Sequence, residues 1–291
     1  MEETEEKKKK TTSGFTEDIS KEMSNSNPLP VEDAFSNLHQ CYVSISGHTR
    51  IFTATKYGKR FMLKCLKNDF LYTPIYRQAL AKEFEIGQQL EHPNICRTID
   101  LEKVDNLGTV VVMEYIDGDN LEQLIKKNAL SAELARKIAG QLMDALEYMH
   151  NKQMIHRDLK PSNIMITHNG QNVKLIDFGI AKHMRTLTSH DKHLTKAGMF
   201  MGKPEYAAPE LVLGEIGEQN QTTDIYAVGI LLYQCIVGHP PFEGDKADIL
   251  RNQLHKKLPL RPVHDKEIRK IIERATEKTR AKRYQSAAEF R

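Results

Sequence analysis

The sequence predicts an α+β fold of two lobes, in which a small antiparallel β-sheet with one helix precedes a larger, mostly helical lobe. Two observations carry this prediction. The stretch from Cys41 to Leu66 is rich in Val, Ile, Phe, Thr and Tyr and is broken only by turn residues. Between Leu134 and Met149, apolar residues recur every three or four positions, as on one face of a helix. We expect a disordered tail over 1–30, the first lobe over 31–116 and the second over 117–291.

The composition is that of an ordinary soluble globular protein, with 40% hydrophobic and 28% charged residues over 291 positions. A net charge of +3 is too small to indicate nucleic acid or a membrane surface as the partner. No apolar run reaches the roughly 18 residues of a membrane span, and the N-terminus lacks the apolar core of a signal peptide. The four cysteines are scattered without a Cys-x-x-Cys pair, which favours reduced thiols in a cytoplasmic protein.

Both ends of the chain differ from the rest. Within residues 1–30, four glutamates are followed by four consecutive lysines and then by a Ser/Asn/Pro-rich stretch. So few apolar side chains cannot offset the entropy of ordering, and we therefore expect a solvated, disordered tail. From Ala281 to Arg291 the pattern is helical and amphipathic and shows no stop signal. This predicts a last helix, with the parent protein continuing beyond Arg291.

In the first lobe, turns at Ser46-Gly47-His48 and at Tyr57-Gly58 divide the β-rich stretch into three strands. The third strand carries Lys64 between two apolar neighbours. A lysine in such a run is usually a solvent-facing or edge residue. If it is half-buried, its ammonium group requires an anionic partner.

The partner of Lys64 is expected on the next element, a helix between Pro74 and Leu90 that ends before His92-Pro93. Glu83 and Glu85 are the two candidates on this helix. They project about 200° apart around its axis, so only one of them can face the strand. Either could instead be an ordinary surface carboxylate.

Two short strings further along the chain carry the chemistry. His156 to Asn163 reads His-Arg-Asp-Leu-Lys-Pro-Ser-Asn, and Asp177-Phe178-Gly179 begins fourteen residues after Asn163. Together they supply a candidate base, a lysine and two metal-binding side chains. Phosphoryl transfer from a magnesium nucleotide requires a positioned acceptor hydroxyl and positive charge around the phosphate oxygens. The strings therefore predict phosphoryl transfer, against the alternative of a charged surface loop.

The two strings resemble the catalytic loop and the metal-binding motif of the eukaryotic-like (Hanks-type) serine/threonine protein kinases. Four later segments resemble the same family: Gly202–Glu210, Asp224–Gly229, His239–Phe242 and Arg283–Ala287. The chain has no tryptophan, and a tyrosine at 226 stands where animal kinases usually carry one. The resemblance is therefore to the bacterial branch, and it covers residues 38–291.

The resemblance implies ATP and Mg²⁺ as cofactors and protein Ser/Thr hydroxyls as acceptors, with self-phosphorylation possible. Asp158 would be the base, Lys160 would lie beside the transferring phosphoryl group, and Asn163 would complete the catalytic set. Asn163 and Asp177 would bind Mg²⁺. Asp224 would brace the backbone of the catalytic loop.

The resemblance also implies a nucleotide site. Lys64 would contact the phosphates, with Glu83 as its partner because it lies ten residues before Pro93, as in the family. Met113 would guard the back of the adenine pocket. The remaining implied site residues are Val43, Ser44, Ser46, Gly47, Thr49, Ile51, Glu114 and Ile116, the last two through their backbone carbonyl and amide groups.

The loop before Ile51 and the residue at 203 depart from the family pattern. Ser44, Ser46 and Thr49 replace the three glycines that let the backbone approach the phosphates, so close approach is expected to be hindered. Lys203 replaces a threonine that bonds the catalytic aspartate and lysine. Lysine accepts no hydrogen bond, and its positive charge is expected to repel Lys160, so the alignment of the acceptor hydroxyl is expected to suffer.

A regulatory site is implied by Arg157 and Lys182, which resemble the pair that binds a phosphate on the activation segment of such kinases. Thr195, seven residues before Gly202, is the best candidate acceptor, ahead of Thr186, Thr188 and Ser189. All four could also be plain polar loop residues. Without phosphate, we expect the segment from about 183 to 200 to be mobile.

Three functions compete at this stage. The leading hypothesis is an active serine/threonine protein kinase. The second is a pseudokinase that binds nucleotide or a partner without turnover, motivated by the glycine-poor loop and by Lys203. The third is a small-molecule kinase of the aminoglycoside or choline type, which the Ala-Pro-Glu segment ending at Glu210 disfavours.

The resemblance also implies that Arg283 pairs with Glu210 as a buried structural ion pair.

Overall fold

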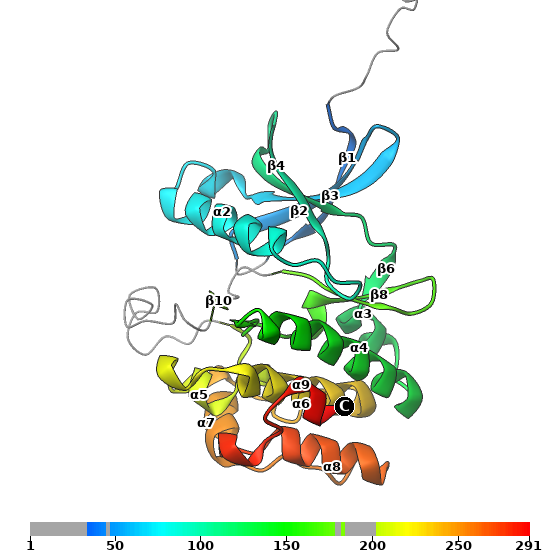
Figure 1. Cartoon of the computed structure of the whole chain (residues 1–291), viewed down its shortest axis with the longest axis vertical. Coiled ribbons are helices and arrows are strands. Elements are labelled where there is room, and N and C mark those ends of the chain that lie inside the picture. The colour runs from blue at the N-terminus through cyan, green and yellow to red at the C-terminus, as the bar shows by residue number, and fades with distance from the viewer. Residues whose placement is uncertain (1–33, 45–46, 178–181, 184–201) are drawn as a thin grey trace, which may run out of the picture.

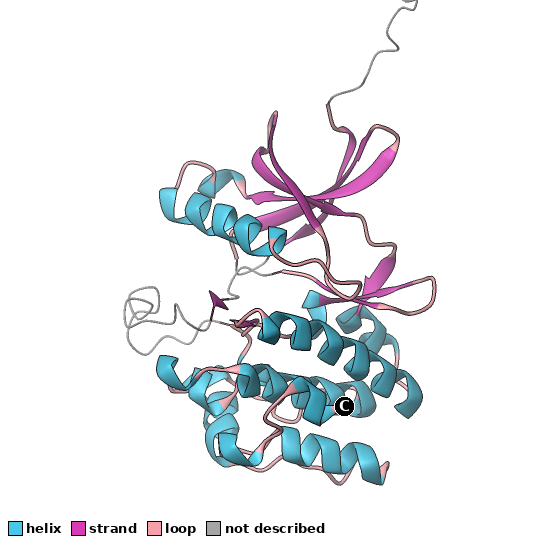
Figure 2. Cartoon of the chain, viewed as in Figure 1, coloured by secondary structure: helices cyan, strands magenta, loops and turns pink. Residues whose placement is uncertain are grey.

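The computed structural model describes residues 34–44, 47–177, 182–183 and 202–291 (Figure 1). The expected disordered tail at 1–30 lies outside these ranges. The described chain forms a sheet-bearing lobe followed by a helical lobe, and Figure 2 shows the large sheet in the first and most of the helices in the second. This confirms the predicted α+β bilobal fold.

The first lobe is built on one antiparallel sheet with the strand order β1-β2-β3-β5-β4. Its strands are β1 (Ser36–Val43), β2 (Thr49–Lys56), β3 (Lys59–Leu66), β4 (Thr98–Val104) and β5 (Gly108–Glu114). Tyr57 and Gly58 both have positive φ, the conformation of the two-residue turn that joins twisted strands such as β2 and β3. The three strands predicted within Cys41–Leu66 are confirmed.

Helix α2 (Pro74–Gln88) follows η1 (Asn68–Phe70) and lies along one side of the sheet (Figure 1). Successive side chains of a strand point to opposite faces. Met62 and Leu66 of β3 pack with Leu80 of α2, whereas Leu63 and Cys65 belong to a separate cluster on the other face. Lys64 therefore shares the α2-facing side of the sheet with Met62 and Leu66.

Among the described residues, five short strands and one 3₁₀ turn alternate with loops in the region where the two lobes meet. They are β6 (Gly118–Asn120), β7 (Met154–Ile155), η2 (Pro161–Asn163), β8 (Ile164–Thr167), β9 (Val173–Leu175) and β10 (Lys182–His183). Strands β6, β8 and β9 form one small antiparallel sheet, and β7 pairs with β10 in another. This framework flanks the string His156–Asn163 and leads to Asp177.

The second lobe is helical, as predicted. Its elements are α3 (Leu121–Lys127), α4 (Ala132–Asn151), η5 (Pro204–Tyr206), α5 (Pro209–Val212), η6 (Ile216–Glu218), α6 (Gln221–Val237), α7 (Lys246–His255), α8 (Lys266–Ala275), η7 (Arg280–Lys282) and α9 (Ala287–Phe290). Helix α4 buries the predicted apolar face, and α6 is buried along nearly its whole length. These two helices form the centre of the largest core cluster.

The prediction of one helix over 281–291 is wrong. The backbone is extended at Arg283, and a new short helix, α9, begins after Ser286, whose hydroxyl accepts a hydrogen bond from the Glu289 amide. The extended backbone lets the Arg283 side chain enter the core, where it contacts Glu210. The tertiary ion pair therefore overrides the local helical pattern.

In the part of the chain that the structure describes, none of the helices combines the length and the apolar character that a bilayer crossing requires. All four cysteines are unpaired, and only Cys41 is exposed.

Candidate active site

Lys64 links strand β3 and helix α2 of the first lobe to the loop that follows β9. Its side chain is 5% exposed, and its Nζ lies 2.5 Å from Glu83 Oε1 and 2.9 Å from Asp177 Oδ1. The predicted pairing of Lys64 with Glu83 is thus confirmed, while Glu85 is exposed. The helix register follows from packing, because Leu80 and Gly87 lie on the same buried side of α2 as Glu83.

The charges around Lys64 balance its burial. Burial alone would lower the pKa of Lys64, but the carboxylates of Asp177 and Glu83 hold it above its ordinary value. The ammonium group therefore stays charged in a largely dry site. It presents a fixed positive charge beside the Asp177 carboxylate, which is about one-third exposed.

The catalytic-loop string folds back on itself between β7 and β8. Lys160 Nζ donates a short hydrogen bond to Asp158 Oδ2. Asn163 Nδ2 donates to the Asp158 backbone oxygen at 2.9 Å and to its Oδ2 at 3.2 Å. The three residues predicted to act together are therefore in direct contact.

Backbone hydrogen bonds hold the two residues that precede Asp177. The Ile176 amide donates to the Asn163 carbonyl at 2.9 Å, and the Leu175 amide donates to the Asn94 carbonyl at 2.8 Å. These bonds place Asp177 next to the catalytic loop. Asp177 itself has a φ of 67°, a left-handed conformation that non-glycine residues seldom adopt and that is often found at functional sites.

Asp224 braces the catalytic loop from below, as predicted. This fully buried carboxylate accepts from the backbone amides of His156 and Arg157, each at 2.9 Å, and contacts His150 Nε2 at 2.9 Å. Burial would raise the pKa of Asp224, but the bonds to His150 and to the amides hold it below its ordinary value. Arg157 has a φ of 66°, so the brace also stabilises a strained backbone turn.

The loop between β1 and β2 is only partly described. The Ser44 amide donates to the Thr49 carbonyl at 3.0 Å, and the Gly47 amide donates to Ser44 Oγ at 2.8 Å. Val43 is exposed on β1, and Ile51 lies opposite Lys64 on β2. Ser46 lies outside the described residues.

The segment after β5 contains the residues predicted to meet adenine. Met113 and Ile116 are buried within the core cluster that faces α2. The Glu114 amide donates to the Arg97 carbonyl at 3.0 Å, and the Glu114 carboxylate lies 2.7 Å from Lys174 Nζ. The side chain of Glu114 is thus engaged away from its own backbone carbonyl.

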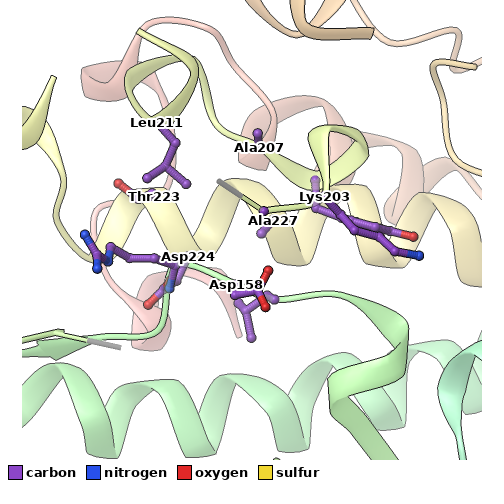
Figure 3. A pocket seen from close by; sticks show the side chains of 11 residues that line it. Asp158, Lys203, Ala207, Leu211, Thr223, Asp224 and Ala227 are labelled. Atoms are coloured by element: carbon purple, nitrogen blue, oxygen red, sulfur yellow. The ribbon is translucent and has the colours of Figure 1, made fainter. Parts of the chain in front are cut away.

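Lys203 was expected to repel Lys160, but it pairs with a carboxylate of α3 instead. Its Nζ lies 3.5 Å from Glu122 Oε1 on α3, and in Figure 3 its side chain extends away from Asp158. An ammonium group gains from a carboxylate and loses near a second ammonium group, so Lys203 turns towards α3. Lys160 is left bonded to Asp158.

Of the predicted regulatory residues, the structure describes Arg157 fully and only the backbone of Lys182. Arg157 Nη1 donates to Gln219 Oε1 at 3.2 Å, and Lys182 in β10 pairs with Ile155 of β7. Thr195 lies outside the described residues. Sequence reasoning missed His150 and Gln219, because neither belongs to a motif and both are brought to the loop only by tertiary packing.

Comparison with known proteins agrees with this geometry. Residues 46–290 match the protein kinase domain family. The chain belongs to this family. A probable serine/threonine-protein kinase of Streptomyces coelicolor is 34% identical over 246 residues, which cover 81% of this chain and 36% of that protein.

Two further bacterial relatives place the kinase domain in the same branch. Serine/threonine-protein kinase PrkC of Bacillus subtilis is 33% identical over 234 residues, covering 78% of this chain and 35% of that protein. Serine/threonine-protein kinase PknA of Mycobacterium tuberculosis is 32% identical over 260 residues, covering 86% of this chain and 58% of that protein. The predicted resemblance to bacterial Hanks-type serine/threonine kinases is confirmed. The aligned part of this kinase domain spans between about a third and three-fifths of these relatives.

Proposed function

We propose that this domain transfers the γ-phosphoryl group of ATP to serine and threonine hydroxyls of proteins, its own included. The observation that carries the proposal is the contact of Lys64 with both Glu83 and Asp177, beside the cluster of Asp158, Lys160 and Asn163. The contact supplies a fixed positive charge, and the cluster supplies an oriented carboxylate. Phosphoryl transfer depends on such positioning and charge more than on covalent chemistry.

Each side chain has a definite task in this proposal. Asp158 accepts the proton of the acceptor hydroxyl, and its carboxylate is oriented for this by the bonds from Lys160 and Asn163. Lys160 also faces the charge that develops on the transferring group. Lys64 holds the phosphates that remain on the nucleotide.

The residues present fit a magnesium ion. The side-chain nitrogen of Asn163 donates to Asp158, so the side-chain oxygen of Asn163, Oδ1, can act as a metal ligand. Asp177 adds a carboxylate. Mg²⁺ is commonly held by one or two such oxygens together with water and phosphate oxygens. The site therefore needs no cluster of three or more His, Cys, Asp or Glu side chains, and none that could hold a metal is found among the described residues. When bound, the ion would neutralise phosphate charge.

The proposal extends to the parts that position the nucleotide and regulate the domain. Val43, Ile51 and Met113 would line the adenine ring of ATP. The Glu114 carbonyl and the Ile116 amide would pair with the edge of that ring. Arg157, Lys182 and a phosphorylated Thr195 would order the activation segment.

We divide the two lobes between residues 116 and 117. We also place the domain in the cytoplasm, where ATP is available and the four unpaired thiols stay reduced.

One observation favours a nucleotide-binding pseudokinase as the second candidate. The Gly47 amide is taken by Ser44 Oγ, and a Cβ at Gly47 would come within 2.4 Å of that oxygen. An amide engaged in this way is not presented to a phosphate. The loop must rearrange if it is to cradle ATP as a glycine-rich turn does.

A single incubation separates the two candidates. The purified domain is mixed with ATP and Mg²⁺, and its phosphorylated residues are mapped by mass spectrometry. The kinase proposal expects phosphate on Ser or Thr in the native chain and none in the Asp158→Asn variant. Asp117→Asn, which changes an exposed surface carboxylate, serves as the matched control and should label normally. Nucleotide binding without any label in the native chain would support the pseudokinase instead.

A further inference from the structure

A buried hydrogen-bond chain connects the C-terminal part of the second lobe with the segment beside the catalytic loop. Lys278 Nζ donates to the Tyr226 hydroxyl at 2.7 Å, and this hydroxyl donates to Gln253 Oε1 at 2.5 Å. Gln253 Nε2 then donates to the carbonyls of Glu205 at 2.5 Å and Pro204 at 3.3 Å. The chain thus links α6, α7 and the loop after α8 to η5.

The direction of every proton in this chain is fixed by its far end. Backbone carbonyls only accept, so the Gln253 amide must turn its NH₂ group towards η5. Its oxygen then faces Tyr226, whose hydroxyl must donate to it and can accept only from Lys278. Because Tyr226 and Gln253 are both 0% exposed, water cannot replace a lost partner.

The hydrogen-bond chain ends at the turn formed by residues 204–207, which lies beside Asp158, the proposed catalytic base. Gly202, Lys203, Tyr206 and Ala207 line the same small cavity as Asp158 (Figure 3). Within the turn, the Ala207 amide donates to the Pro204 carbonyl, the same carbonyl that Gln253 contacts. The position of this turn therefore depends directly on Gln253.

Lys278 is held by aromatic rings and by a hydroxyl. Its Nζ lies 5.2 Å from the ring centre of Tyr226 and 5.3 Å from that of Phe242. Burial and the nearby Arg283 guanidinium lower its pKa to about 8, while Glu277 raises it. A buried amine without a hydrogen-bond partner would be costly in free energy, so the bond from Lys278 to the Tyr226 hydroxyl is strongly favoured.

We propose that Tyr226, Gln253 and Lys278 are positioning residues that hold residues 204–207 in the shape that receives the protein substrate next to Asp158. They act through the turn and touch neither ATP nor the acceptor hydroxyl. Their loss should weaken the productive binding of the protein substrate and leave ATP binding unchanged. The inference rests on the proposed function for its substrate, but the placement of the turn can be measured without it.

The test compares two Tyr→Phe changes on the same helix. Tyr226→Phe removes the central link and leaves Gln253 Oε1 buried without a donor. Tyr233→Phe is the matched control, since its hydroxyl contacts the Pro259 carbonyl at 3.3 Å, away from the 204–207 turn. The purified domain is assayed for the KM of a Ser/Thr peptide substrate, the KM of ATP, and amide hydrogen exchange over residues 204–207, where Glu205, Tyr206 and Ala207 carry the exchanging amides.

We expect Tyr226→Phe to raise the KM of the peptide about 5-fold to 150-fold, the range set by one unsatisfied buried acceptor. The KM of ATP should stay within about 2-fold, and exchange at 204–207 should accelerate. Tyr233→Phe should leave all three unchanged, and Lys278→Met, at the outer end, should give a smaller shift in the same direction. Equal effects of Tyr226→Phe and Tyr233→Phe on the peptide KM, or unchanged exchange at 204–207, would overturn the inference. An inactive native domain would contradict the proposed function alone, because the exchange measurement would still decide the positioning role.

Discussion

Replacing Arg283 by methionine is expected to destabilise the domain strongly, because it leaves a buried carboxylate without its countercharge. The Arg283 and Glu210 side chains are 0% and 3% exposed. The guanidinium group donates to both Glu210 oxygens and to the carbonyls of Thr222, Glu277 and Lys278. After the change, Glu210 keeps the Thr223 hydroxyl as a donor. Breaking one side of such a buried pair costs about 3–5 kcal/mol of the free energy of unfolding.

Urea denaturation of the native and variant domains measures this loss. Arg280→Met is the matched control three residues earlier, since its partner Glu218 is half exposed and a pair of that kind contributes less than about 1 kcal/mol. The double variant Arg283→Met/Glu210→Met should lose less than the sum of its two single changes, because the unpaired charge is removed. If Arg283→Met costs no more than Arg280→Met, the reasoning about this buried pair is refuted.

Three further changes have expected outcomes. Glu83→Gln should lower turnover by about 10-fold to 100-fold in steady-state assays, because a displaced Lys64 misplaces the phosphates; unchanged turnover would contradict the assigned pairing. Lys203→Thr should change turnover by less than about 5-fold, since Lys203 is about half exposed and a surface ion pair such as the one it makes with Glu122 contributes little; a larger gain in turnover would support the predicted repulsion between Lys203 and Lys160. Burial lowers the pKa of His156, so its contribution to stability is full above about pH 6.5 and is lost as the pH falls below that value. His156→Gln should therefore flatten the fall of the free energy of unfolding below pH 6.5, by up to about 1.4 kcal/mol per pH unit, and an unchanged slope would contradict this.

The strands and long helices could be predicted because their residues carry local signals. The β-rich composition and the turn residues of Cys41–Leu66 predicted three strands, and the structure confirms them as β1, β2 and β3. Likewise, the apolar face of α4 determines which of its sides is buried. The contact of Lys64 with Glu83 could be predicted only with the helix register that the family resemblance supplied.

Contacts between distant segments could not be predicted in the same way. The helical pattern of 281–291 competes with the Arg283–Glu210 pair, and nothing in the local sequence shows that the pair is the stronger. Lys203 was expected at Lys160, because the sequence does not reveal that Glu122 lies within reach. The Gln253 side chain carries no motif, and its role follows only from the packing of α7 against η5.

The most direct test of the proposed chemistry is a comparison of Asp158→Asn and Lys64→Met with the native domain, using a Ser/Thr peptide, ATP and Mg²⁺. Calorimetry gives the affinity for ATP, and initial rates give turnover. Asp158→Asn should bind ATP normally and lose about 10²-fold to 10⁴-fold in turnover, because it removes only the proton acceptor. Lys64→Met should lose at least as much turnover, through misplaced phosphates. Undiminished phosphate transfer by the purified Asp158→Asn domain would contradict the assignment of Asp158 as the base.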